Sequence, residues 1–202
     1  MPIQNDMFQE LDLPANPLVE GFQPPVGLFK DRKNRYYPVD KKNINEQTKK
    51  IFDELGLTVG GIIIFKKCQN GMSPVHSDLL LMNDRWIKWH AAINYNLTTA
   101  DSNMTWYETK LKEIYPSDIN SNQPLEYNLS GIHYGYLGNR NINCPDFSLI
   151  GSCRLTKPTL LRTDIPHTTV NLDSRDRVCA SIRFANNYTY QELLEKFSKI
   201  GQ

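Results

Sequence analysis

Hydrophobic residues recur along most of this chain with the spacing of β-strands, and with the spacing of a helix in two places. Alternating or continuous apolar runs predict strands at residues 60–67, 88–97, 148–155, 159–163, 167–171 and 177–184. No helical segment separates successive strands in this region. The pattern therefore indicates a mainly β protein.

The strand expected at residues 177–184 has two chemically different faces. Because successive side chains of a strand point to opposite sides, one face carries apolar residues throughout: Val178, Ala180, Ile182 and Phe184. The other face carries Arg177, Cys179, Ser181 and Arg183. The alternation thus separates an apolar face of this strand from a polar one.

Two segments have the apolar spacing and the end signals of helices. The first begins at Asn45, a capping residue, runs to Leu55, and is followed by Gly56, which can adopt the left-handed conformation that ends a helix. The second begins with Thr189 and Glu192, which form a capping box ahead of an apolar stripe. We expect one helix before the strands and one after them.

Many short strands flanked by two helices favour a jelly-roll barrel over an α/β sheet. A length of 202 residues is compatible with one domain. We expect a lead-in with an edge strand and the first helix at residues 1–58, the jelly-roll core at 59–186, and the C-terminal helix at 187–202. Residues 118–146 are rich in Asn, Ser, Gly and Pro, and predict a long loop that acts as a substrate lid.

Composition and charge narrow the classes of function. The chain is 40% hydrophobic and 22% charged with a net charge of +1, which is typical of a globular protein with no global field for nucleic acid or membrane. The longest apolar run, residues 60–65, is too short to span a bilayer, and the N-terminus lacks a secretion signal. We expect a cytoplasmic protein with four reduced cysteines. One basic run at residues 30–50 indicates a solvated face more than an anion-binding patch.

Three residues have the types and spacing of a metal site. His76 and Asp78 form an H-x-D pair, which on a strand points both side chains to one face. A second histidine, His167, lies far downstream and is followed ten residues later by Arg177. Two imidazoles and one carboxylate on one side of an ion leave open positions, as in the facial triad of non-haem iron(II) oxygenases. The H-x-D pair alone is weak evidence for a metal site, and the prediction depends on His167 and Arg177 as well.

Several stretches resemble the 2-oxoglutarate- and iron(II)-dependent oxygenases of the double-stranded β-helix fold. They are Pro74–Asp78, Ala91–Asn94 followed by Thr105–Glu108, and the distal segment from His167 to Phe184. The chain looks closest to the aspartyl/prolyl hydroxylase-like branch found in phage and bacteria. The resemblance implies a mainly β, double-stranded β-helix (jelly-roll) fold with flanking helices. It also implies a hydroxylase that oxidises a C–H bond while 2-oxoglutarate is converted to succinate.

Residue by residue, the resemblance assigns His76, Asp78 and His167 to iron(II), and Arg177 to the distal carboxylate of 2-oxoglutarate. A planar guanidinium suits that contact, and Arg175, in the turn before the strand, is the rival. In many relatives a serine two residues after the arginine shares the carboxylate, whereas here that position is Cys179. Three other residues are candidates to compensate for it: Ser181, Asn94 and Tyr107. No catalytic residue is expected beyond the metal ligands.

Trp106 and His90 are candidates for substrate contacts, although a core aromatic residue and a structural histidine are the ordinary interpretations of such positions. The expected partners are dioxygen and a small-molecule or peptide substrate, and the oligomeric state is left open. Two other functions also stay open: a non-catalytic, cupin-like binding jelly roll, and a nucleobase-acting oxygenase suggested only by the basic run. A zinc hydrolase is disfavoured because it has no use for Arg177.

Overall fold

The computed structural model describes the chain in segments, and all structural statements below refer to them: residues 6–24, 27, 35–82, 85–110, 113–114, 132–137 and 147–200. For a few strand positions only the backbone is described: residues 35, 80–82, 85–86, 113–114 and 132–137.

The described residues form mostly strands, as the sequence predicted. The strands are β1 (Phe8–Glu10), β2 (Arg35–Val39), β3 (Val59–Lys67), β4 (His76–Met82), β5 (Arg85–Lys88), β6 (Ala91–Asn96), β7 (Ser102–Thr109), β8 (Glu113–Ile114), β9 (Ile132–Leu137), β10 (Phe147–Arg154), β11 (Thr159–Arg162), β12 (His167–Asn171) and β13 (Arg177–Phe184). The helices are η2, a 3-10 turn (Lys41–Asn43), α1 (Glu46–Glu54) and α2 (Tyr190–Phe197).

Eight of these strands pair in the nested order of a jelly roll. In chain order they are β3, β4, β6, β7, β10, β11, β12 and β13. The first pairs with the last, β4 with β12, β6 with β11, and β7 with β10, all antiparallel. This nesting wraps the chain into two facing sheets, so the predicted mainly β jelly roll with flanking helices is confirmed.

The remaining strands widen the two sheets. One sheet has the order β1-β11-β6-β13-β3-β2, and the other has β10-β7-β12-β4-β9-β8, with β5 paired to β4. The lead-in supplies both edges of the first sheet, with β1 at one and β2 at the other, so the expected edge strand is present. We refer to these as the six-stranded sheet and the second sheet.

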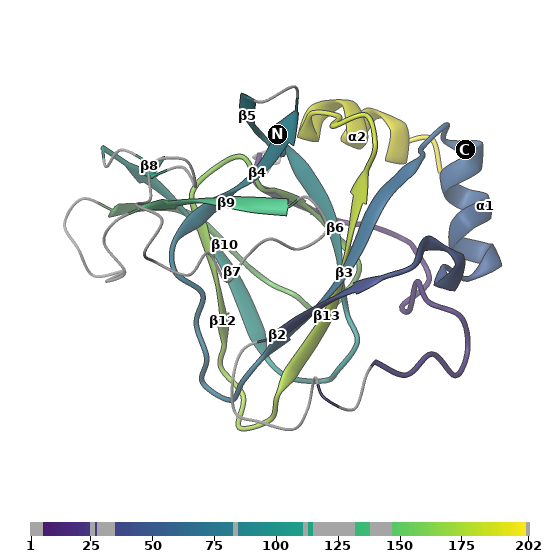
Figure 1. Cartoon of the computed structure of the whole chain (residues 1–202), viewed down its shortest axis with the longest axis horizontal. Coiled ribbons are helices and arrows are strands. Elements are labelled where there is room, and N and C mark those ends of the chain that lie inside the picture. The colour runs from purple at the N-terminus through teal and green to yellow at the C-terminus, as the bar shows by residue number, and fades with distance from the viewer. Residues whose placement is uncertain are drawn as a thin grey trace.

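Both helices cover the outer face of the six-stranded sheet, on the side away from β7 and β12 (Figure 1). The predicted end signals are present: Asn45 accepts from the Thr48 amide, Gly56 has φ +64°, and Thr189 forms the capping box of α2. The buried cluster beneath the helices includes the predicted apolar face of β13, which is confirmed. The opposite face of β13 is free to line a site between the sheets.

Two predictions about segments need correction. The expected strand at residues 88–97 is shorter, because Lys88 ends β5 of the second sheet and β6 of the six-stranded sheet begins only at Ala91. The expected loop at residues 118–146 contains β9, which pairs with β4. The alternation of Ile132, Tyr134 and Tyr136 is a strand signal that the surrounding Asn and Gly residues obscured. The rest of that segment lies outside the described residues.

Neither α-helix of the described chain has the length and apolarity needed to cross a bilayer. Three cysteines are unpaired and buried, as expected for reduced thiols: Cys68, Cys153 and Cys179. The fourth, Cys144, lies outside the described residues.

Candidate metal and anion site

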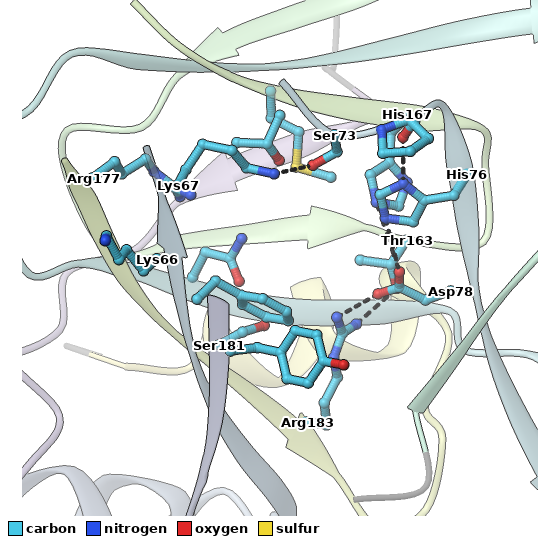
Figure 2. A pocket seen from close by; sticks show the side chains of 16 residues that line it. Lys66, Lys67, Ser73, His76, Asp78, Thr163, His167, Arg177, Ser181 and Arg183 are labelled. Carbon is cyan, nitrogen blue, oxygen red and sulfur yellow. Dashed lines mark hydrogen bonds and ion pairs between the residues drawn. The ribbon is translucent and has the colours of Figure 1, made fainter. Parts of the chain in front are cut away.

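A cavity of about 150 Å³ lies between the inner faces of the two sheets, and charged side chains from both sheets line it. From the six-stranded sheet come Lys67 of β3, Asn94 of β6, and three residues of β13: Arg177, Ser181 and Arg183. From the second sheet come His76, Asp78 and His167. In Figure 2, Lys67 and Arg183 extend from the six-stranded sheet toward the side of the cavity that carries His76, Asp78 and His167.

Strand pairing brings the three predicted metal ligands together. His167 of β12 lies directly opposite His76 of β4, and Asp78 follows two residues later on the same face. The Asp78 Oδ1 atom lies 3.6 Å from His76 Nε2 and 3.8 Å from His167 Nε2. Potential ligand atoms of all three lie within 4.8 Å of one another. The two distances from Asp78 Oδ1 are too long for hydrogen bonds, and they are short enough for one ion to contact this oxygen and an imidazole nitrogen at about 2.1 Å each.

Backbone carbonyl groups fix the tautomers of both histidines. His76 Nδ1 donates to the Pro74 carbonyl oxygen at 2.7 Å, and His167 Nδ1 donates to that of Ile165 at 2.8 Å. Because a carbonyl oxygen only accepts, each ring carries its proton on Nδ1 and presents the Nε2 lone pair toward Asp78. Burial, and then the proximity of the second titratable ring, His167, lower the pKa of His76 to about 3. Burial also lowers the pKa of His167, so both rings are neutral ligands at pH 7.

Arg183 holds the other oxygen of the buried Asp78 carboxylate. Its Nη2 forms an ion pair with Asp78 Oδ2, its Nη1 donates to Thr163 Oγ1 at 3.1 Å, and its guanidinium lies 5.7 Å from the ring centroid of Trp89. The Arg183 and Asp78 side chains are 4% and 2% exposed. Arg183 thereby orients the carboxylate, so that Oδ1 faces the two histidines.

Arg177 is a buried cation that no described carboxylate neutralises. It is 2% exposed, lines the cavity, and leaves its Nε and Nη2 groups without hydrogen-bond partners in the described chain. Ser181 and Asn94 lie opposite each other on β13 and β6, and each has a buried side-chain oxygen without a partner. Buried polar groups in proteins are normally paired, so the unpaired donors of Arg177 and Ser181 give this side of the cavity the character of a binding site for an anion.

Lys67 lies directly opposite Arg177 on β3. Its Nζ donates to Ser73 Oγ at 2.6 Å. Burial, and then the charge of Arg177, lower the pKa of Lys67 to about 8. At pH 7 the cavity therefore holds two adjacent buried cations.

The remaining predicted residues are not among those that line the cavity. Tyr107 packs with Val75 and Phe147 on the other face of the second sheet. Trp106 is fully buried and donates from Nε1 to the Arg162 carbonyl oxygen. His90 Nδ1 lies 3.5 Å from Asp164 Oδ2, and its side chain is 36% exposed. None of these three is among the residues that line the cavity. Arg175, the rival of Arg177, pairs with Asp173 at the surface.

Two functional candidates were not identified from the sequence. Arg183 shares the polar face of its strand with Arg177, and this alternation was a usable signal. Lys67 ends an apolar strand as one of two consecutive lysines, and only the pairing register shows that it faces inward.

Comparison with known proteins gives no family. No protein-family model matches this chain, and no curated protein matches it in sequence. Similar solved structures include the cysteine peptidase Peruvianin-I from Thevetia peruviana latex, at 14% identity and a TM-score of 0.38, over 82% of this chain and 70% of that one. Others are the vicilins of hazelnut, Corylus avellana (9%, TM-score 0.36, 78% of this chain and 30% of that one), and Capsicum annuum (10%, 0.38, 90% and 42%). This chain spans less than half the length of either vicilin. At such TM-scores these likenesses carry no argument about function.

Proposed function

We propose that this protein is an iron(II)- and 2-oxoglutarate-dependent dioxygenase that hydroxylates a C–H bond of an amino acid, a peptide or another small molecule. One observation carries the proposal. One cavity contains the His76, Asp78 and His167 donor set together with Arg177, whose Nε and Nη2 groups have no partner in the described chain.

The donor set fits iron(II). Two imidazole nitrogens and one carboxylate oxygen are the ligands of non-haem iron(II) oxygenases. Both histidines are held in the tautomer that exposes Nε2, and Arg183 occupies Asp78 Oδ2, which favours one-oxygen coordination through Oδ1. Three protein ligands leave positions open for small molecules. Bound iron(II) would supply the redox chemistry that reduces dioxygen while 2-oxoglutarate is oxidised to succinate and carbon dioxide.

The residues of the six-stranded sheet fit the organic co-substrate. A keto acid whose chelating end is at the metal site would extend toward β13, where Arg177 offers two unpaired N–H donors to the distal carboxylate. Ser181 and Asn94 line the same side and can contribute further hydrogen bonds. Ser181 is positioned to take the role that Cys179 performs poorly, because a thiol is a weak donor. These contacts would orient the keto acid and exclude water from its path.

A non-catalytic, cupin-like metal-binding jelly roll is the alternative that the fold and the donor set also accommodate. It gives no role to the unpaired buried donors of Arg177. For a nucleobase-acting oxygenase, the described part of the basic run at residues 30–50 would have to lie near the cavity, and α1 does not place it there. Lys49 and Lys50 are exposed on α1, which packs on the face of the six-stranded sheet opposite the cavity.

The test is succinate formation from 2-oxoglutarate by iron(II)-loaded protein in air. Free amino acids, prolyl and aspartyl peptides, and methylated nucleic acids form the substrate panel, and Asp78→Ala is the control. We expect one class to give succinate together with a hydroxylated product. Metal binding without succinate above the Asp78→Ala level for any class would favour the non-catalytic alternative.

A further inference from the structure

We propose that Lys67 is a second anion-binding residue of the cavity, and that Lys67 and Arg177 together hold the distal carboxylate of the keto acid. This inference rests on the proposed function, and adds to it a residue that neither the metal ligands nor Arg177 imply.

Strand register places these two cations side by side. Lys67 and Arg177 are direct cross-strand partners on β3 and β13, and such partners share a face with their Cβ atoms about 5 Å apart. Like charges in this arrangement are destabilising unless an anion compensates. The preceding residue shows the contrast: Lys66 points to the other face and forms an ion pair with Asp176 at 3.2 Å. No carboxylate of the described chain forms such a pair with Lys67 or Arg177.

The Lys67 amine points into the path that a metal-bound keto acid would follow. Figure 2 shows the side chain extending from β3 toward Ser73, which lies beside His76 and His167. An ammonium group has three donors, and the hydrogen bond to Ser73 Oγ uses one of them. A carboxylate placed near Arg177 would accept from both cations. It would neutralise a charge that is otherwise buried without compensation.

The proton affinity of the amine supports this placement. Burial and the charge of Arg177 lower the pKa of Lys67 to about 8. The charged or titratable groups that interact with the amine are Cys68, the residue after it in the chain, Arg177 on β13 and His76 on β4. A carboxylate bound beside the amine would raise its pKa again, because an opposite charge favours the protonated form. Keto acid binding just above pH 8 would then be accompanied by proton uptake.

Calorimetric titrations of two keto acids into manganese(II)-loaded protein at pH 7 test the assignment. The two ligands are 2-oxoglutarate and 2-oxobutyrate, which share the chelating group but differ in the distal carboxylate. We expect Lys67→Met to weaken 2-oxoglutarate about tenfold or more and to leave 2-oxobutyrate unchanged. Lys67→Arg, which keeps the charge, should retain most of the affinity. Unchanged 2-oxoglutarate affinity in Lys67→Met, or equal losses for both ligands, would overturn the role of Lys67.

A second measurement does not depend on the folding of Lys67→Met. Titration of wild type with 2-oxoglutarate at pH 8.5, in two buffers of different ionisation enthalpy, should show net proton uptake. Uptake should be absent with 2-oxobutyrate and in Lys67→Arg, because arginine does not titrate in this range. Binding of 2-oxoglutarate to wild type without proton uptake would contradict the inference and leave the proposed function standing. Failure of wild type to bind 2-oxoglutarate would instead refute the proposed function, and this inference with it.

Discussion

Replacement of Arg183 by methionine should destabilise the metal-free protein strongly and the metal-loaded protein much less. Arg183 is the ion-pair partner of the Asp78 carboxylate, and both side chains are almost fully buried. Methionine keeps most of the apolar volume beside Trp89 but leaves the carboxylate without its counter-charge. A divalent ion at the site would supply positive charge on the other side of the same carboxylate.

The magnitude follows from burial. Removal of one partner from a buried ion pair costs about 3–5 kcal/mol, because the other charge stays desolvated and uncompensated. For a chain of this size that loss lowers the midpoint of thermal unfolding by roughly 6–20 °C. With metal bound, we expect the loss to fall to less than about half of this value, since Asp78 retains a cationic partner.

Urea unfolding of wild type and Arg183→Met, each metal-free and loaded with manganese(II), measures both values. Arg154→Met is the matched control. Arg154 makes a two-point contact with Asp101, but the two side chains are 65% and 35% exposed. Its loss should cost about 0–1 kcal/mol with or without metal. Equal losses for Arg183→Met and Arg154→Met in the metal-free protein, or a loss in Arg183→Met that metal does not reduce, would refute the reasoning.

Three further predictions concern the same cavity. Calorimetry should detect no metal binding to His76→Ala, Asp78→Ala or His167→Ala, since each variant lacks one of the three ligands. Full-strength binding to any one of them would show that the replaced residue is not a ligand. Arg177→Ala should bind metal normally but 2-oxoglutarate about 100-fold more weakly, a loss of about 3 kcal/mol. Surface Arg175→Ala should bind both normally, and the reverse result would contradict the site. The folded-state pKa of Lys67, about 8, is below its ordinary value of 10.5, so the unfolded chain binds more protons between these values. The unfolding free energy of the metal-free wild type should therefore contain a contribution that rises from pH 8 to 10.5. This contribution should be absent in Lys67→Met, and identical pH profiles of the unfolding free energy for the two proteins would contradict the prediction.

The parts of this structure that the sequence predicted are those set by local periodicity. Alternation along residues 177–184 placed Arg177 and Arg183 on one face and the core residues on the other. The two-residue spacing of His76 and Asp78 likewise put both on one face of β4. Helix ends were predictable because capping depends on neighbouring residues, as at Asn45.

What the sequence could not show depends on contacts between distant strands. The pair formed by Arg183 and Asp78 joins β13 of one sheet to β4 of the other, and no spacing rule relates them. Lys66 and Lys67 are adjacent and chemically alike, and only the register between β3 and β13 shows that Lys67, and not Lys66, lies opposite Arg177. Trp106 is a related case. Alternation shows that Trp106 and Tyr107 lie on opposite faces of β7, but it does not show which buried cluster each of them joins.

The most direct test of the central claim is the binding of 2-oxoglutarate to the wild-type protein with and without metal. The account predicts that the manganese(II)-loaded protein binds it, and that binding is lost when metal is removed and falls strongly in Arg177→Ala, because the ligand joins the two halves of one cavity. Absence of binding to the metal-loaded protein, or equal affinity with and without metal, would contradict the account.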